Sequence, residues 1–439
     1  MTEIITILEI LRPVLTTKTF NQLAVIIEAT LAMSGRVTML GIARWAEKGG
    51  SYRTVQRFFN QTHDWAKLRW LLVKSHLLEK SGVWLIIADE VIVTKSGKKT
   101  FGLGNFFSSL QNQVVPGLCF LSFSLLHVES EKSFPLLVLP LIRPEVAETA
   151  PKAAQSTDNK RKPGRPKGSQ NKNRAEVELS PFLLLVKSGL KQLIDIISNS
   201  LKINHFVYDG ALGNNGAVQM TKQCGLFLIS KLRCDSVLYF PFAGSYSGRG
   251  RPPKYGEKVT LETLTDAHLC EPAKIEGDVE SKLYQVQVWH KLFPSLLNVV
   301  IVVKTNRKTG KMAKVLLFSD DLSLRFDNLI AYYQLRFQIE FNFRDAKQYW
   351  GLEDFMNTGQ TQVSNAANFS LFMVTFSQLL AMKVVGLEKN SMLDLKTVFR
   401  ARKVTRRIIN ALGINPDAIV INDKIFQAAE IGRIYSKAA

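Results

Sequence analysis

The sequence has few cysteines, and they form no pattern that would bind zinc or build a disulfide framework. The chain has four of them, far apart, with no CxxC pair and no Cys/His pair at metal-binding spacing: Cys119, Cys224, Cys234 and Cys270. This pattern argues against zinc fingers and disulfide-rich secreted scaffolds. We expect free, mostly buried thiols in a reducing compartment.

Targeting signals and long hydrophobic runs are also lacking. The first ten residues, MTEIITILEI, have no basic region and no cleavage site, so we expect no secretory signal. The apolar stretches 114–126 and 134–142 are too short to span a bilayer and are interrupted by prolines. The sequence therefore predicts a cytoplasmic protein with no membrane partner.

Acidic residues are scarce relative to basic ones. The chain has 57 Lys and Arg against 37 Asp and Glu, a formal net charge of +20. Each basic side chain that neutralises a phosphate releases a condensed counterion, so this excess favours a nucleic-acid partner. A basic protein without a nucleic-acid role and a protein bound to an anionic membrane surface remain alternatives.

The N-terminal part, residues 1–80, has the pattern of a helical domain. Its segment MLGIARWAEKGGSYRTVQRFF predicts a helix-turn-helix, with a glycine turn at 49–50 and Ser51 as the N-cap of the second helix. We expect Arg53 and Arg57 on that second helix to contact DNA in a major groove. An ordinary helical hairpin is the alternative interpretation.

Three carboxylates stand out by their positions. The short apolar runs VWLIIADEVIV and HFVYDG predict buried strands that end at Asp89 and Asp209, and Glu340 lies within the predicted helix YYQLRFQIEFNFRDAKQYW. Glu90 should point to the opposite face of its strand and Asp345 to another side of its helix, so we exclude both. In-line phosphodiester chemistry uses two divalent ions about 3.5–4 Å apart, held by hard oxygen ligands. Three converging carboxylates therefore predict a site for two Mg²⁺ or Mn²⁺ ions.

The helix that carries Glu340 also predicts a narrow polar stripe. At about 100° per residue, a stripe about 80° wide contains Tyr333, Arg336, Glu340, Arg344 and Lys347. Apolar residues gather on the opposite side, which we expect to face the core. The cations are suited to grip phosphates that flank a cut. The alternative is a solvated face with intrahelical Arg–Glu pairs, each worth about 0.3–0.5 kcal/mol.

Two further segments have basic Gly-Arg-Pro patterns. Residues 145–176 are polar and rich in Lys, Pro, Gly and Ser, a composition that predicts a loop without a core. Within them, RKPGRPKGS looks like an AT-hook, and we expect Arg165 and Lys167 to enter a narrow A·T-rich minor groove. The segment GRGRPPK repeats the pattern with Arg251. The alternative for both is a solvated basic loop.

The order strand-Asp, strand-Asp, helix-Glu resembles the DDE transposases, whose catalytic core has the ribonuclease-H-like fold. Tyr333, Arg336, Glu340 and Lys347 match the Y-(2)-R-(3)-E-(6)-K signature of bacterial cut-and-paste transposases related to insertion sequence four. The segments KSGKKTFG, DGALGNNGA and LRFQIEFNFRDAKQYWGLEDF also look like this family. The resemblance covers roughly residues 35–385.

The resemblance implies a two-metal mechanism. One strand is nicked at the transposon end, the freed 3′-hydroxyl forms a hairpin with the opposite strand, and the reopened 3′ ends are joined to target DNA. It further implies that the three carboxylates hold the ions and that Tyr333, Arg336 and Lys347 bind DNA near the cut. Hairpin formation needs a base moved out of the stack. Trp289 is our candidate to receive that base, with simple packing in its sheet as the alternative.

The predicted fold is α/β. A ribonuclease-H-like core (81–240 and 306–385) is interrupted by a β-rich insertion (241–305), preceded by the helical DNA-binding domain and followed by a basic helical tail (386–439). The expected partners are double-stranded DNA, as terminal inverted repeats and target, and a second copy of the chain in a synaptic complex. The tail is a plausible interface. We expect a nucleoid-associated bacterial enzyme. A nuclease without strand transfer and a catalytically silent DNA-binding protein are the alternatives.

Overall fold

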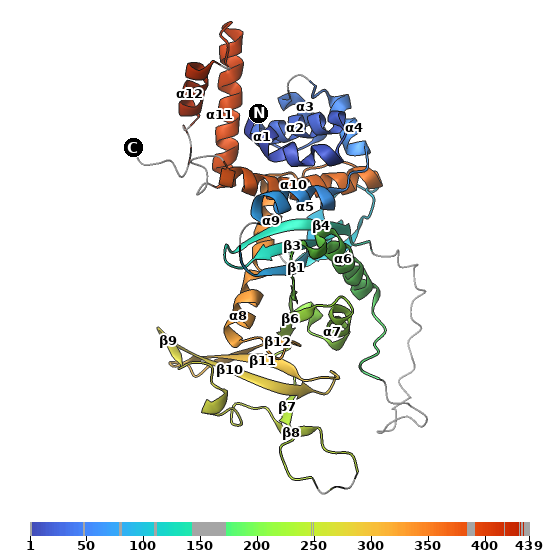
Figure 1. Cartoon of the computed structure of the whole chain (residues 1–439), viewed down its shortest axis with the longest axis vertical. Helices are drawn as coiled ribbons and strands as arrows, with labels where there is room; N and C mark the ends of the chain where they lie inside the picture. Colours follow the sequence, from blue (N-terminus) through green and yellow to red (C-terminus); the bar gives the residue numbers. More distant parts are fainter. Residues whose placement is uncertain are drawn as a thin grey trace. The chain divides into compact units, whose positions relative to one another are not determined.

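The computed structural model of the chain divides into two compact units (Figure 1). The structure describes residues 2–46, 49–78, 81–108, 112–142, 173–246, 248, 250–383, 391–416, 418–429, 431 and 433. The first unit comprises Met1–Leu141, Ser188–Tyr208 and Ala331–Ala439. The second comprises Ile142–Lys187 and Asp209–Ile330. Most of the AT-hook-like segment, including Arg165 and Lys167, lies outside the described residues.

The first unit begins with helices, as the sequence predicts. In chain order they are α1 (Thr2–Leu8), the 3-10 helix η1 (Glu9–Val14), α2 (Thr17–Ala32), α3 (Met39–Trp45), α4 (Tyr52–Asn60) and α5 (Trp65–Leu77). Polar N-caps set the starts of four of them, because Thr16, Thr38, Ser51 and Asp64 each accept a hydrogen bond from a backbone N–H of the first turn. The glycine turn and the Ser51 cap between α3 and α4 are as expected, with Gly49 at a φ of 88°.

The sheet of the first unit is mixed and largely buried. It contains β1 (Trp84–Thr94), β2 (Gly104–Ser108), β3 (Gln113–His127), β4 (Lys132–Pro140) and β5 (His205–Val207). β1 lies antiparallel to β3 and parallel to β5, with Ile86 opposite Phe206 and Ile87 opposite Val207. β2 and β4 pair with successive parts of β3. The near-continuous apolar runs in β1 and β3 are those of strands covered on both faces.

Helices of the same unit cover this sheet. α5, α9 (Gln338–Gln348) and α10 (Gln360–Lys383) pack on β4, and α9 also contacts β1. Two asparagines of the buried helix α10 join it to α5: Asn365 accepts from Trp65 Nε1 at 2.8 Å, and Asn368 accepts from the buried Arg69 guanidinium. α10 is therefore a central packing element of the first unit.

The basic tail forms α11 (Met392–Ala411) and α12 (Ile419–Ala428). Several of its cations contact the first unit's own helices. Lys396 Nζ donates to the Thr30 carbonyl at 2.9 Å, and Arg400 donates to the carbonyls of Ala32 and Met33. These side chains satisfy the unpaired carbonyls at the C-terminal end of α2. Their charge therefore stabilises a helix end.

The second unit is built on an antiparallel sheet. The order along it is β6 (Phe227–Leu232), β12 (Met312–Ser319), β11 (Leu297–Asn306), β10 (Val279–His290), β7 (Leu238–Pro241) and β8 (Tyr255–Lys258), with β9 (Lys274–Glu276) paired to β10. α7 (Asn215–Lys222) and the 3-10 helices η3 (Gly210–Leu212) and η4 (Asp266–His268) also belong to this unit. The strands expected within 241–305 are present, and β12 pairs them with β6 in one sheet.

The prediction of one continuous helix over YYQLRFQIEFNFRDAKQYW is wrong in one respect. The helix is broken into α8 (Phe326–Leu335) and α9, with Arg336 and Phe337 between them. Short-range hydrogen bonds tighten the chain here: Phe337 N–H donates to the Gln334 carbonyl, and Glu340 N–H donates to the Phe337 carbonyl. The 100° step used on the sequence therefore does not hold across the break.

α6 (Pro181–Ile197) and the 3-10 helix η2 (Ser198–Ser200) precede β5 in the chain. Among the described residues, no helix has the length and apolar character needed to cross a membrane.

Candidate catalytic site

The prediction that the strand ends at Asp89 is wrong, because β1 continues to Thr94 in its antiparallel pairing with β3. Asp89 lies inside β1, just past its fully buried half. Residues 84–88 are buried, and the Asp89 side chain is 22% exposed. Its Oδ1 accepts from the Glu90 backbone N–H at 2.8 Å, and its Oδ2 accepts from Arg336 Nη1 at 2.6 Å. One carboxylate oxygen is therefore held by the strand and the other by a cation from a distant part of the chain.

Glu340 shares that cation. Its Oε1 lies 3.8 Å from Arg336 Nη2, and it sits in the first turn of α9. Partial burial raises the pKa of Glu340, the Arg336 charge lowers it, and the Asp89 carboxylate raises it further. The two carboxylates are therefore close enough to repel each other electrostatically. The structure brings Asp89, Arg336 and Glu340 together.

Asp209 opens the second unit directly after β5. Its side-chain Oδ1 accepts from the Ala211 N–H at 2.9 Å and caps η3. Its carbonyl accepts from the Ser230 hydroxyl. In the register of β1 and β5, Ile87 pairs with Val207, and each aspartate follows its own paired residue by two positions.

The donor chemistry of Asp89 and Glu340 fits a hard divalent cation. Two carboxylates face one guanidinium, so the protein already places a positive charge between oxygen ligands of the kind that Mg²⁺ prefers. Within the described part of the chain, no group of three or more His, Cys, Asp or Glu side chains is gathered closely enough to hold a metal ion. Asp89 and Glu340, both in the first unit, could therefore share one ion.

The other stripe residues have protein partners. Tyr333 lies half-buried on α8. Lys347 Nζ forms an ion pair with Glu353 Oε1 at 2.9 Å. Arg344 donates to Asp345 and lies 4.9 Å from the Phe341 ring centroid. Asp345 is buried, and this burial raises its pKa against the lowering effect of Arg344.

The helix pair α3–α4 presents a basic surface. Val55, Phe58 and Phe59 of α4 are buried, whereas Arg53 and Arg57 are exposed. The exposed arginines are therefore placed where a ligand can reach them, as the helix-turn-helix interpretation requires.

Trp289 belongs to an aromatic cluster of the second unit. It lies on β10 opposite Tyr239 of β7, and its ring meets that of Tyr255 edge-on. Lys254 Nζ lies 3.6 Å from the Trp289 ring centroid. The indole is half-buried and is covered by this ammonium. Arg251, three residues before Lys254, is exposed.

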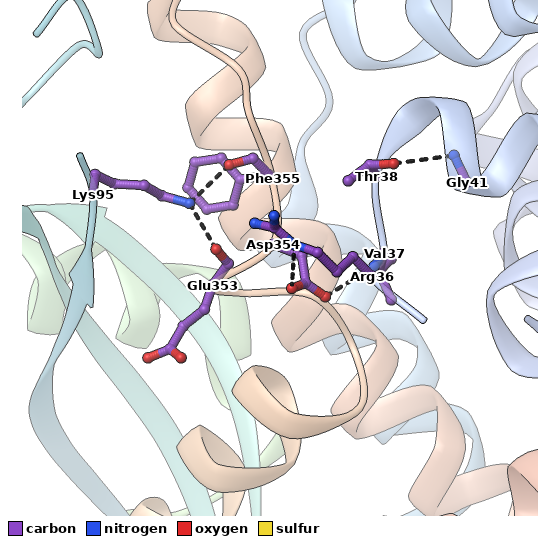
Figure 2. A network of polar contacts seen from close by, with 8 residues as sticks. All are labelled: Arg36, Val37, Thr38, Gly41, Lys95, Glu353, Asp354 and Phe355. Atoms are coloured by element: carbon purple, nitrogen blue, oxygen red, sulfur yellow. Dashed lines mark hydrogen bonds and ion pairs between the residues drawn. The ribbon is translucent and has the colours of Figure 1, made fainter. Parts of the chain in front are cut away.

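One polar junction was missed in the sequence. Lys95, the residue after β1, donates from Nζ to the carbonyls of Glu353 and Phe355 at 3.0 and 2.8 Å, and lies 3.6 Å from the Phe355 ring centroid (Figure 2). Burial lowers the pKa of Lys95 to about 8. The strand that carries Asp89 is thus joined to the loop that follows α9.

The same loop reaches the helix-turn-helix. Asp354 accepts from the Val37 backbone N–H at 2.8 Å and from Arg36 Nε at 3.4 Å, just before Thr38 caps α3 (Figure 2). The sequence could have pointed to this junction, because KSGKKTFG and the segment ending in LEDF resemble the family and contain Lys95 and Asp354.

A family comparison covers most of these elements. Residues 11–286 match the family model described as DDE superfamily endonuclease, which is more than half of the chain and includes Asp89 and Asp209. The match ends before Glu340. No curated protein matches the chain. The mixed α/β architecture, with its large sheets and covering helices, is consistent with a DDE nuclease fold. The chain therefore belongs to the family of DDE superfamily endonucleases.

Proposed function

We propose that this chain is a DNA transposase of a bacterial cut-and-paste element related to insertion sequence four. It binds the terminal inverted repeats, cleaves them by way of a hairpin intermediate, and joins the 3′ ends to target DNA. The observation that carries the proposal is the meeting of Asp89, Arg336 and Glu340 in a member of the DDE family. Two of these residues come from the Y-R-E-K signature.

Asp209 is the third carboxylate of the proposed site. Asp209 is two residues after Val207 of β5, and Asp89 is two residues after Ile87 of β1, which pairs with Val207. The two strands are parallel. The order strand-Asp, strand-Asp, helix-Glu that the chain shares with the DDE transposases is what supports this assignment. We therefore assign the metal ligands as Asp89, Asp209 and Glu340 on a ribonuclease-H-like core.

Bound Mg²⁺ or Mn²⁺ ions would supply an activated water or 3′-hydroxyl and would stabilise the leaving oxygen. The chain's own cations have a separate task, because Arg336, Lys347 and Arg344 are suited to hold the phosphates around the cut. Tyr333 lies on the helix just before Arg336 and would contact the same strand. Arg53 and Arg57 would hold the transposon end.

Trp289 is the proposed receiver of a flipped base. Its ring is covered by Lys254, so a base would stack there only after the ammonium moves to a phosphate. Stacking on an aromatic side chain is worth about 1–3 kcal/mol per base, enough to compensate part of the cost of unstacking. The exposed Arg251 and the AT-hook-like Arg165 and Lys167 are proposed to hold flanking DNA.

The proposed working form is a homodimer, because two transposon ends must be paired. An exposed apolar stripe at four-residue spacing runs along α11 and ends at its C-cap: Val404, Ile408 and Leu412. Burying such a stripe against a partner helix removes apolar surface from water and is favourable. We propose that it contacts the second copy.

The test is cleavage of labelled DNA that carries the element's ends, with Mg²⁺, by native protein and by Glu340→Gln. Glu9→Gln is the matched control, because Glu9 forms an exposed pair with Arg12. We expect native and control proteins to release hairpin or blunt ends and to join them to a second DNA, and Glu340→Gln to bind without cutting. Cutting without joining would instead favour a plain nuclease. Binding without cutting by all three would favour a silent DNA-binding protein.

A further inference from the structure

Arg336 has contacts that differ from those of a surface arginine. Its side chain is 14% exposed, and Nη1 and Nη2 face the two carboxylates at 2.6 Å from Asp89 and 3.8 Å from Glu340. Its buried Nε has no hydrogen-bond partner among the described residues. The guanidinium is therefore committed to the site by its two terminal nitrogens.

The charges explain why a cation is needed there. Asp89 and Glu340 both lie within 3.8 Å of the same guanidinium, at 2.6 and 3.8 Å. A partly buried, charge-assisted hydrogen bond of this length is much stronger than an exposed ion pair. Without Arg336, two carboxylates would repel each other in a half-buried place.

A divalent ion would use the same oxygen atoms. Asp89 Oδ1 already accepts from a backbone N–H, and Oδ2 is the atom that Arg336 holds. An ion bound by Asp89 and Glu340 would bring two positive charges to the place where the guanidinium now supplies one. The two cations therefore compete for Asp89 Oδ2.

The backbone allows Arg336 to leave. It lies between α8 and α9, outside both helices, while Glu340 is fixed within α9. Moving its guanidinium away from Asp89 needs only rotation about side-chain bonds.

We propose that Arg336 is a placeholder cation. In the metal-free protein it holds Asp89 and Glu340 together, and a divalent ion displaces it from Asp89. The displaced guanidinium is then available to a DNA phosphate, so metal binding strengthens the binding of DNA at the site. This inference rests on the proposed metal site.

The test is Mn²⁺ binding without DNA, measured by titration calorimetry on the full chain. Native protein is compared with Arg336→Gln and with Arg325→Gln, a control that removes an exposed arginine paired with a single aspartate, Asp327. Removal of the competitor should tighten Mn²⁺ binding by Arg336→Gln about tenfold, and the control should bind as native does. Unchanged or weaker binding by Arg336→Gln overturns the inference.

One further variant and one further measurement test the same competition between Arg336 and the metal ion. Arg336→Lys retains a charge that reaches one carboxylate less well, so its affinity should lie between those of native and Arg336→Gln. The melting temperature of metal-free Arg336→Gln should fall below that of native, and Mn²⁺ should raise it by more. An equal rise in both proteins contradicts the placeholder role.

Asp89→Asn separates the two proposals. If it binds Mn²⁺ as tightly as native protein does, the metal site itself is wrong and the proposed function fails with it. If it loses binding while Arg336→Gln binds no more tightly than native, the function stands and the placeholder role fails alone.

Discussion

Arg336 and Asp89 are 247 residues apart in the sequence, and Nη1 of the first donates to Oδ2 of the second at 2.6 Å. The contact joins the buried strand β1 to the break between α8 and α9. Glu340 lies four residues beyond Arg336, and its Oε1 is 3.8 Å from Arg336 Nη2. The same guanidinium therefore lies between two proposed metal ligands.

The first prediction concerns DNA affinity. Arg53→Gln combined with Arg57→Gln should weaken binding to the element's ends and reduce the slope of log K against log salt concentration by about two, because two phosphate contacts are lost. Fluorescence anisotropy at several salt concentrations measures both. Arg12→Gln with Arg233→Gln removes the same charge from exposed pairs as a control. An equal slope in both double variants would contradict a role for α4 in DNA binding.

The second prediction concerns the junction before α3. Asp354→Ala should lower the free energy of unfolding by about 1–3 kcal/mol, because the Val37 N–H loses its charged acceptor in a buried position. Denaturant titration measures the loss. Asp235→Ala, which removes an exposed partner of Arg233, is the comparison and should cost far less. Similar losses in the two variants would mean that the junction is not a point of stability.

The third prediction concerns pH. Burial lowers the pKa of Lys95 to about 8 from its usual 10.5, so between these values the unfolded chain binds the proton more tightly than the folded one. The cost of burying the charge is therefore fully present below pH 8, and the free energy of unfolding gains from Lys95 as pH rises toward 10.5. Lys95→Met should lack this gain.

The measurement for Lys95 is denaturant unfolding of native protein and Lys95→Met at pH 7.5 and pH 10. Other groups, including Lys396 with its similarly lowered pKa, contribute to both proteins and cancel in the difference. The stability of native relative to variant should increase at the higher pH. A difference that is the same at both pH values would show that Lys95 titrates normally.

Much of the site could be predicted from local patterns. Short apolar β-branched runs marked the strands that lead to Asp89 and Asp209, and the Ser51 cap marked the start of α4. Each of these signals depends on residues close together in the sequence.

The break at Arg336 and Phe337 could not be predicted in this way. The segment contains neither glycine nor proline, and what marks the position is a contact with Asp89 on a distant strand. The inward-facing cations of α11 were missed for a related reason. Composition shows that the helix is basic, but only packing shows that Lys396 and Arg400 meet the end of α2.

The fourth prediction concerns assembly. Ile408→Glu places a charge in the exposed apolar stripe of α11 and should shift the protein toward monomer, because burying an unpaired carboxylate in an interface is costly. Sedimentation velocity measures the mass, and Ile431→Glu is a control, since Ile431 is exposed beyond α12. Ile408 is itself exposed, so the fold should survive. An unchanged mass for Ile408→Glu in a protein whose native form is dimeric would place the interface elsewhere.

The most direct test of the central claim is a change of metal preference at Asp209. Asp209→Cys replaces a hard oxygen ligand by a softer thiolate, which binds Mg²⁺ poorly and tolerates Mn²⁺ better. The account predicts that this variant fails to cut the element's ends with Mg²⁺ and regains part of the activity with Mn²⁺, while Asp209→Ala regains none. Native-like cutting with Mg²⁺ by Asp209→Cys, or no difference between the Cys and Ala variants with Mn²⁺, would contradict the assignment of Asp209 as a metal ligand.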